Sequence, residues 1–228
     1  MRKLLELLVL LTVLCSCSVT QSIRLEQDLG GDADMKVESS DFFDAVLLDL
    51  SPATGDDAME ATMKALAVNL ELAGATSLRQ DGLGMSFSFI NLPATLSLLA
   101  GRALDSIIRF SEQDGLNTMI FHLDMDNYHL LEEAIPFLSE PNFQVYGPVY
   151  NSYMDDSEYL EMMDFIFGPD ASENIMASSI SIVFSVPGII ESTSSQALDE
   201  SSFSYSFPLM DFLMLKKPLE CTCTWKAF

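Results

Sequence analysis

The chain has 228 residues, of which 49% are hydrophobic and 10% aromatic, enough for the core of one large domain or two small ones. It carries 34 Asp and Glu residues against 11 Lys and Arg, a formal net charge of −23. A surface this negative repels phosphate backbones and anionic lipid headgroups, which excludes nucleic-acid binding and polybasic membrane docking. Cations and basic proteins remain as charged partners. Two histidines and four cysteines leave few residues for metal or nucleophile chemistry.

The N-terminus has the composition of an export signal. Arg2 and Lys3 give it a positive start, and an almost unbroken apolar stretch follows over residues 4–14. This stretch is too short to span a bilayer as a helix, which takes about 20 apolar residues. We therefore predict a signal peptide at residues 1–16.

The signal ends in a pattern that points to lipid attachment. Leu14-Cys15-Ser16-Cys17 resembles the bacterial lipobox, in which an apolar, a variable and a small residue precede the cysteine that receives the lipid. Acyl chains such as palmitate, attached together at Cys17, would make the anchoring lasting. The alternative is an ordinary secretory signal with two incidental cysteines. A lipidated chain would belong to the bacterial cell envelope, held to a membrane and facing the periplasm or the exterior.

Cleavage before Cys17 changes the charge little. It removes two basic residues and one acidic residue, so the mature chain holds 9 basic and 33 acidic residues and a net charge of −24. Strand-like patterning begins near Ser22, which predicts a short lipidated tether at residues 17–21 and a single domain at residues 22–228.

Several segments alternate apolar and polar residues with a period of two, which is typical of strands with one buried face. The segments lie near residues 23–29, 35–37, 85–89, 107–110, 119–125, 180–186, 203–207 and 219–225. Gly30-Gly31 and Asp114-Gly115 are expected to form the turns of two hairpins. None of these segments is the continuous apolar run that a buried parallel sheet needs, so we predict antiparallel strands.

Five other segments have apolar residues at helical spacing. They begin near Ser40, residues 54–57, Asn91, Asn127 and Ser157, and Gly74 and Pro136 are expected to end the second and the fourth. The fold class predicted is therefore α+β, an antiparallel sheet with about five helices packed on its apolar face. Residues 142–156 and 191–202 are expected to be loops.

Cys221 and Cys223 are the two thiols that remain in the folded part of the chain. A thiol pair could bind a soft metal or cycle in redox chemistry, but a structural zinc site wants four ligands. The period of two places both on the face of Leu219 and Trp225, so we expect buried, inert core cysteines. No cofactor is predicted.

His122, Asp124 and Asp126 share one face of a predicted strand and are the weak candidates for a metal site, although no metal is predicted. A calcium-loop pattern fails here, because Tyr128 and His129 occupy a ligand position and the glycine position.

Carboxylate clusters such as that around Asp155 could hydrolyse glycosides, but a helix cap explains the cluster equally well. Catalysis is therefore unsupported.

The last fifth of the chain carries a family resemblance. Residues 180–190, with Pro187-Gly188, followed by residues 203–209 and 218–225, resemble the strand, Pro-Gly, strand ending of the LppM-type envelope lipoprotein domain. Residues 77–82 are similar to an early segment of related lipoproteins. Two departures are the stretch 192–202 in place of an Asn-Gly turn, and Tyr205 in place of a tryptophan. The resemblance implies a non-enzymatic envelope lipoprotein with an α+β domain and transfers no functional residue.

Two functions of different classes follow. The first is a lipid-anchored protein with a binding or scaffold role, whose partners are the membrane and either an apolar or lipid ligand or a basic protein. Its thirteen methionines could line an adaptable apolar pocket, although filling of the core is their more common use. The second is an envelope hydrolase that uses paired carboxylates. A closed cavity without convergent carboxyl groups would favour the first function.

Overall fold

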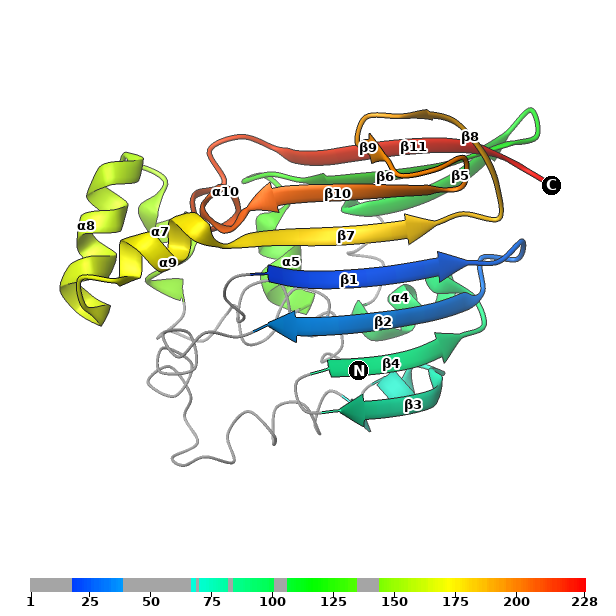
Figure 1. Ribbon diagram of the computed structural model, residues 1–228, viewed down its shortest axis with the longest axis horizontal. Coiled ribbons are helices and arrows are strands. Elements are labelled where there is room, and N and C mark those ends of the chain that lie inside the picture. Colours follow the sequence, from blue (N-terminus) through cyan, green and yellow to red (C-terminus); the bar gives the residue numbers. More distant parts are fainter. Residues whose placement is uncertain (1–17, 39–66, 69, 82–83, 101–105, 135–143) are drawn as a thin grey trace.

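The computed structural model describes residues 18–38, 67–68, 70–81, 84–100, 106–134 and 144–228, and within them the strands form two sheets (Figure 1). The larger sheet has seven strands, in the order β3 (Thr76–Asp81), β4 (Gly84–Phe89), β2 (Gly31–Glu38), β1 (Ser18–Leu25), β7 (Ser179–Ser185), β10 (Ser202–Pro208) and β9 (Gln196–Ala197). The smaller sheet has four, in the order β5 (Ile108–Gln113), β6 (Leu116–Leu123), β11 (Leu219–Ala227) and β8 (Gly188–Thr193).

The fold class is α+β, as predicted, and the strands pair antiparallel with one exception. β1 and β7 run parallel, with Ile23 opposite Phe184. The chain passes from the larger sheet to the smaller at Val186 and Pro187, between β7 and β8. The prediction of one sheet is wrong, because a period of two shows which face of a strand is buried but not which sheet the strand joins.

The first hairpin is confirmed, with β1 and β2 joined by a turn at residues 26–30. The turn is closed by hydrogen bonds from the Glu26 amide to the Gly30 carbonyl (2.7 Å) and from the Leu29 amide to the Glu26 carbonyl (2.9 Å). β1 begins at Ser18, so residues 18–21 form part of the sheet and not the predicted tether. The reason is Gln21, a polar side chain that is buried at a core position and hides the strand pattern.

The two sheets bury their apolar faces against each other. Phe121 of β6 and Tyr205 of β10 lie 5.8 Å apart between ring centroids, and so connect the smaller sheet to the larger. The smaller sheet therefore covers part of the face that was expected to carry helices. Each sheet has one apolar face, and packing the two faces together removes both from water.

The helices that the structure describes are α4 (Leu92–Ala100), α5 (Tyr128–Ala134), α7 (Pro148–Asn151), α8 (Asp156–Phe167), α9 (Ala171–Ala177) and α10 (Leu209–Met214). Residues 67–68 and 70–72 are also helical, and this segment ends before Gly74, as predicted. The predicted helix from Ser40, the start of the second helix and the stop at Pro136 lie outside the described residues.

Helices α4, α5 and α8 begin within two residues of the positions predicted from the sequence. The side chain of Asn91 accepts a hydrogen bond from the Ala94 amide at 2.9 Å and caps α4. α8 starts at Asp156, after an N-cap at Asp155 and not at Ser157, and the carboxylate of Asp155 and the side chain of Glu158 form a capping box. None of the helices among the described residues is long and apolar enough to cross a bilayer.

Three helices and the strands β3 and β9 were not predicted. α7 lies within the expected loop at residues 142–156, while β9 and the end of β8 lie within the one at residues 191–202. β3 lies in a segment for which no strand was predicted. α9 is a short helix of seven residues. α10 has five buried apolar residues among its six, so it shows no amphipathic period at all.

Gly31 tests the hairpin. The Cβ of an alanine at this position would lie 1.8 Å from the carbonyl oxygen of Arg24, so Gly31→Ala is expected to lower the free energy of unfolding by roughly 3 kcal/mol. Gly115→Ala is the control, since Gly115 has φ of 77° but open space around it, and backbone strain there costs about 1 kcal/mol. Urea unfolding of both variants measures the difference. Equal losses of unfolding free energy in the two variants would contradict the close approach of Gly31 to the Arg24 carbonyl.

Candidate ligand-binding site

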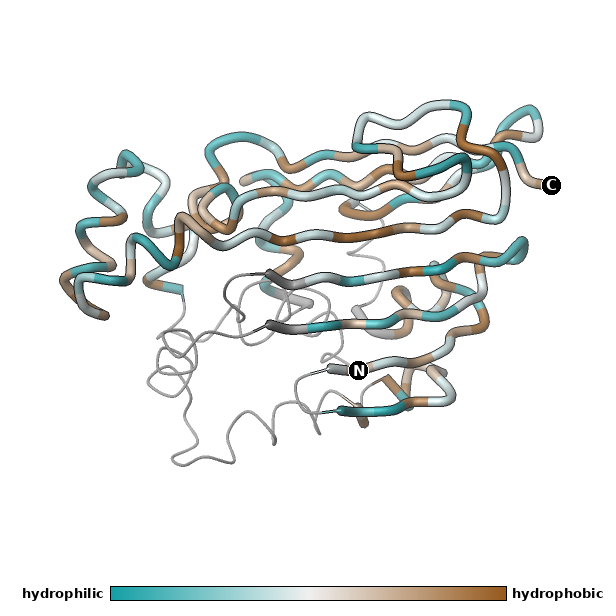
Figure 2. Tube along the Cα trace, viewed as in Figure 1, coloured by the Kyte–Doolittle hydropathy of each residue, from teal (hydrophilic) through white to brown (hydrophobic). Residues whose placement is uncertain are grey.

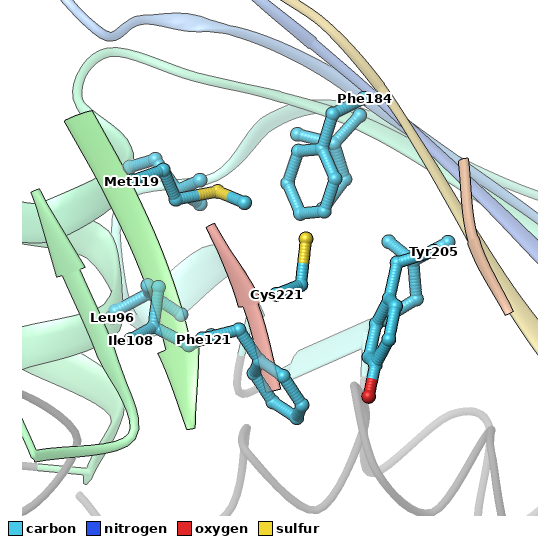
Figure 3. Close-up of a pocket in the computed structure, with 10 residues that line it drawn as sticks. Leu96, Ile108, Met119, Phe121, Phe184, Tyr205 and Cys221 are labelled. Atoms are coloured by element: carbon cyan, nitrogen blue, oxygen red, sulfur yellow. The ribbon is translucent and has the colours of Figure 1, made fainter. Parts of the chain in front are cut away.

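A small apolar cavity lies between the two sheets (Figure 3). Its volume is about 30 Å³ and the surface it presents is entirely apolar. The lining comes from both sheets and from α4, and consists of Ile23, Leu92, Leu96, Ile108, Met119, Phe121, Ile182, Phe184, Tyr205 and Cys221. Figure 3 shows the sulfur of Cys221 pointing toward the space among the rings, whereas the hydroxyl of Tyr205 points away from it.

Strand register places these side chains at one level. In the smaller sheet, Phe121 lies opposite Ile108 on one side and Cys221 on the other. In the larger sheet, Ile23 lies opposite Phe184. Because neighbours across a sheet share a face, these residues meet in the space between the sheets.

The size of the cavity limits what it can hold. A cavity needs about 10–15 Å³ to hold one water, so this one has room for only two or so, and apolar cavities of this kind stay dry. The end of an apolar chain would fit the chemistry of the lining, but a whole ligand would not fit the space.

A larger open cleft of about 840 Å³ adjoins the cavity, and Leu96 and Ile108 line both. The volume lies within the usual range for ligand pockets, about 300–1,000 Å³. The lining mixes polar and apolar groups: Gln27, Asp28, Leu29, Asn91, Pro93, Leu96, Ile108, Arg109, Phe110, Ser111, Glu112, Asn117, Ile120 and Trp225. The two spaces together are therefore amphipathic, with an apolar inner end and a mixed outer part.

The cleft follows the edge of the smaller sheet. β5 is the edge strand, so Ile108 and Phe110 line the cleft from one face of the strand and Arg109 and Ser111 from the other. The opposite wall is the β1–β2 turn and the start of α4, which are joined by a hydrogen bond from the Leu92 amide to the Leu29 carbonyl (2.7 Å).

Charged groups in the cleft are few. Among the described residues that line it, Arg109 is the one basic side chain, and Asp28 and Glu112 are the carboxylates. Asp28 already accepts a hydrogen bond from the Gly30 amide at 3.0 Å and so serves the turn. Trp225 lines the cleft with 1% of its surface exposed, and its indole Nε1 has no hydrogen-bond partner among the described residues.

These cleft residues were not identified from the sequence. They come from four separate segments, and no local spacing links them. Met119, from β6, lines the cavity. The other methionines that are buried among the described residues fill the core, which is the more common use: Met35, Met85, Met163, Met210 and Met214.

Cys221 and Cys223 are buried and free, as predicted. Burial raises the pKa of the Cys223 thiol to about 12, and the neighbouring Cys221 adds to the shift. Burial also raises the pKa of the Cys221 thiol, although a hydrogen bond from the Ser195 hydroxyl at 3.0 Å offsets part of this. Protonated, shielded thiols are poor nucleophiles and poor metal ligands, so these residues serve the core.

The prediction that the three metal candidates share one strand face is wrong, because β6 ends at Leu123. His122 is on the strand, and Asp124 and Asp126 lie in the turn that leads to α5. The imidazole of His122 is 2.9 Å from Asp124 through Nε2 and 3.4 Å from Glu220 through Nδ1. The hydrogen bond with His122 lowers the pKa of the Asp124 carboxyl, and the hydrogen bonds that the carboxylate accepts from the Asn127 and Asp126 amides lower it further. The described residues contain no group of three potential ligands that could hold a metal ion. Cys17 lies outside the described residues.

The carboxylates considered for hydrolysis have structural partners. Asp155 caps α8, and Asp156 is 2.8 Å from Lys216. Burial raises the pKa of the Glu132 carboxyl, against a hydrogen bond from Gln144 that lowers it, but Glu132 lines neither the cavity nor the cleft.

The chain matches no family model and no curated protein sequence. It is similar to a solved structure, the folded domain of the LppM protein of Mycobacterium tuberculosis, determined by NMR. The TM-score is 0.43 and the sequence identity 10%, over 93% of this chain and 91% of that one. This is the type of domain that the last fifth of the sequence resembles.

The raised thiol pKa values predict how stability depends on pH. Above the ordinary value of 9.0 the unfolded thiols ionise while the folded ones stay protonated, so stability is lost as the pH rises. The free energy of unfolding should therefore fall between about pH 9 and pH 10 by up to roughly 1.4 kcal/mol per pH unit for each thiol. Urea unfolding across this range measures the slope. Cys223→Ala should remove the contribution of that thiol and make the slope shallower, and an unchanged slope would contradict the assignment.

Proposed function

We propose that this protein is a lipid-anchored lipoprotein of the bacterial cell envelope that binds an amphiphilic, lipid-like ligand in the cleft. The observation that carries the proposal is the entirely apolar cavity, which shares Leu96 and Ile108 with the open cleft. An amphiphile matches this arrangement, with an apolar end toward the cavity and a polar end in the cleft.

The apolar end of the ligand would supply most of the affinity. Each methylene group transferred from water to an apolar lining contributes about 0.8 kcal/mol. Because the cavity itself is small, a chain would have to enter by displacing the side chains at the junction. Leu96, on α4, lines both the cavity and the cleft and is 7% exposed. A change in the rotamer of its side chain would therefore join the two spaces.

The polar end of the ligand would face a wall of mixed charge. Arg109 offers a fixed positive charge beside neutral groups such as Asn117 and Ser111. The side chain of Asn91 is already engaged, since it donates to the Asp28 carbonyl at 2.9 Å and accepts from the Ala94 amide. The side chains free to adapt to a ligand are therefore on the β5 side of the cleft.

The carboxylates that bear on the alternative, a hydrolase, have other partners or stand apart. Among the described residues the cavity lining has no carboxylate, Asp28 of the cleft serves the β1–β2 turn, and the carboxylates near α8 serve as a helix cap and an ion-pair partner. No observation on the described residues favours the hydrolase over binding.

The ligand is tested directly by mass spectrometry of the protein purified from its membrane in mild detergent. Native spectra should show a co-purifying amphiphile that leaves on organic extraction. A chain that carries only detergent would count against the ligand part of the proposal.

Substitutions on α4 test the site itself. Leu96→Trp should fill the junction between cavity and cleft and weaken binding of a fluorescent fatty-acid probe by about tenfold, equal to 1.4 kcal/mol. Leu98→Trp is the matched control, because Leu98 is on the same helix, 56% exposed, and lines neither space. Equal affinities for the two folded variants would contradict the proposed site.

The anchor is tested by Cys17→Ser. The wild-type chain should be found in the membrane fraction, and its mature N-terminal peptide should have the mass of an acylated cysteine. The variant should lose both the acyl mass and the membrane association. A wild-type chain that is cut elsewhere and unmodified would identify the alternative, an ordinary secretory signal.

A further inference from the structure

A group of helices projects from one end of the larger sheet (Figure 1). We define the helical lobe as residues 144–178, which contain α7, α8 and α9. Its inner side is well packed, with Tyr159, Met163 and Ile175 buried. The hydroxyl of Tyr159 donates a hydrogen bond to the Tyr146 carbonyl at 2.8 Å, which joins α8 to the segment before α7.

The outer side of the helical lobe is unusually apolar. Seven of the fifteen large apolar side chains that are exposed among the described residues belong to it: Val145, Val149, Tyr150, Tyr153, Phe165, Ile166 and Met176. Phe165 is 90% exposed and Tyr153 is 78% exposed. Figure 2 shows hydrophobic, brown segments at the outer end of the lobe, interrupted by hydrophilic ones. Aromatic and aliphatic side chains left in water at this density mark a surface that meets a partner.

The path of the chain indicates which partner this is. β1 and β7 are parallel and both begin at the end of the sheet that carries the lobe, where Ser18 is the Cα partner of Ser179. Ser179 follows α9 after one residue, so Ser18 starts at the base of the helical lobe. Cys17 directly precedes Ser18, and a single residue spans at most about 3.6 Å. A lipid on Cys17 would therefore hold this end of the protein against its membrane.

We infer that the helical lobe is the membrane-facing surface of the protein, and that its exposed apolar side chains enter the interface of the bilayer that holds the lipid of Cys17. This inference rests on the anchor proposed above. Trp, Tyr and Phe side chains are well suited to the interface, where the ring is partly desolvated. The lobe then adds a second attachment to the first and fixes the orientation of the protein on the membrane.

Charge determines the kind of bilayer that fits. Residues 144–178 contain seven carboxylates and no Lys or Arg: Asp155, Asp156, Glu158, Glu161, Asp164, Asp170 and Glu173. Attraction to anionic lipids is therefore excluded as the driving force. Asp155 and Glu158 are engaged in the cap at the start of α8, while Phe165 and Ile166 stand at its other end. Insertion should be driven by apolar contact and should be stronger into zwitterionic than into anionic membranes.

Tryptophan reporters test the inference on the full, lipidated chain in vesicles. The sequence has a single tryptophan, Trp225, which is 1% exposed and lines the cleft, so the unsubstituted chain is measured beside each variant and its emission is subtracted. In Phe165→Trp, the new indole should emit at shorter wavelength on phosphatidylcholine vesicles and lose emission when the acyl chains carry bromine. Part of this loss should disappear when phosphatidylglycerol replaces some of the phosphatidylcholine.

Phe228→Trp is the matched control, because Phe228 is also a phenylalanine, 81% exposed, at the C-terminus, which lies at the far end from the lobe (Figure 1). Its emission should not respond to bromine. Mass spectrometry of the same samples reports acylation at Cys17. Equal quenching of the two reporters, or none of either, on an acylated chain overturns the role of the lobe and leaves the anchor intact. An unmodified Cys17 overturns the anchor, and the inference with it.

Discussion

The parallel pairing of β1 with β7 is the interaction on which the rest of the structure depends. It joins an N-terminal hairpin to the C-terminal half of the chain and is the one parallel pair among the described strands. Without it the larger sheet would separate into two parts. The register also sets Ile23 beside Phe184, two of the residues that line the cavity. A single long-range contact thus fixes the sheet, the cavity and the place where the chain enters the fold.

Much of the local structure could be predicted from the sequence, because alternation and turn chemistry act over a few residues. Phe87 and Phe89, or Cys221 and Cys223, show the period of two plainly, and all four are buried in strands. The start of β1 could not be predicted, since Gln21 puts a polar residue where the pattern requires an apolar one. The second sheet could not be predicted for a different reason. The sheet that a strand joins depends on contacts between segments far apart in sequence.

The same distinction explains the candidate site. Chemistry that depends on one segment, such as the cap at Asp155 or the buried thiols, could be anticipated. The cleft could not, because its walls come from the first hairpin, α4, β5 and the last strand. Its most unusual group is Trp225, whose indole nitrogen is buried without a partner among the described residues. A protein usually satisfies such a group, and Gln21, in the core, has the other buried side-chain atom without a partner among the described residues.

The early start of β1 would also determine how far the cleft stands from a lipid on Cys17. β1 runs from Ser18 to Leu25, and a strand rises about 3.3 Å per residue, so its far end is roughly 23 Å away. The β1–β2 turn that forms one wall of the cleft lies just beyond that end. A ligand in the cleft of an anchored protein would then be held above the headgroups of its own membrane. Exchange of that ligand would take place with a facing surface or a carrier, and not by lateral diffusion in the bilayer below.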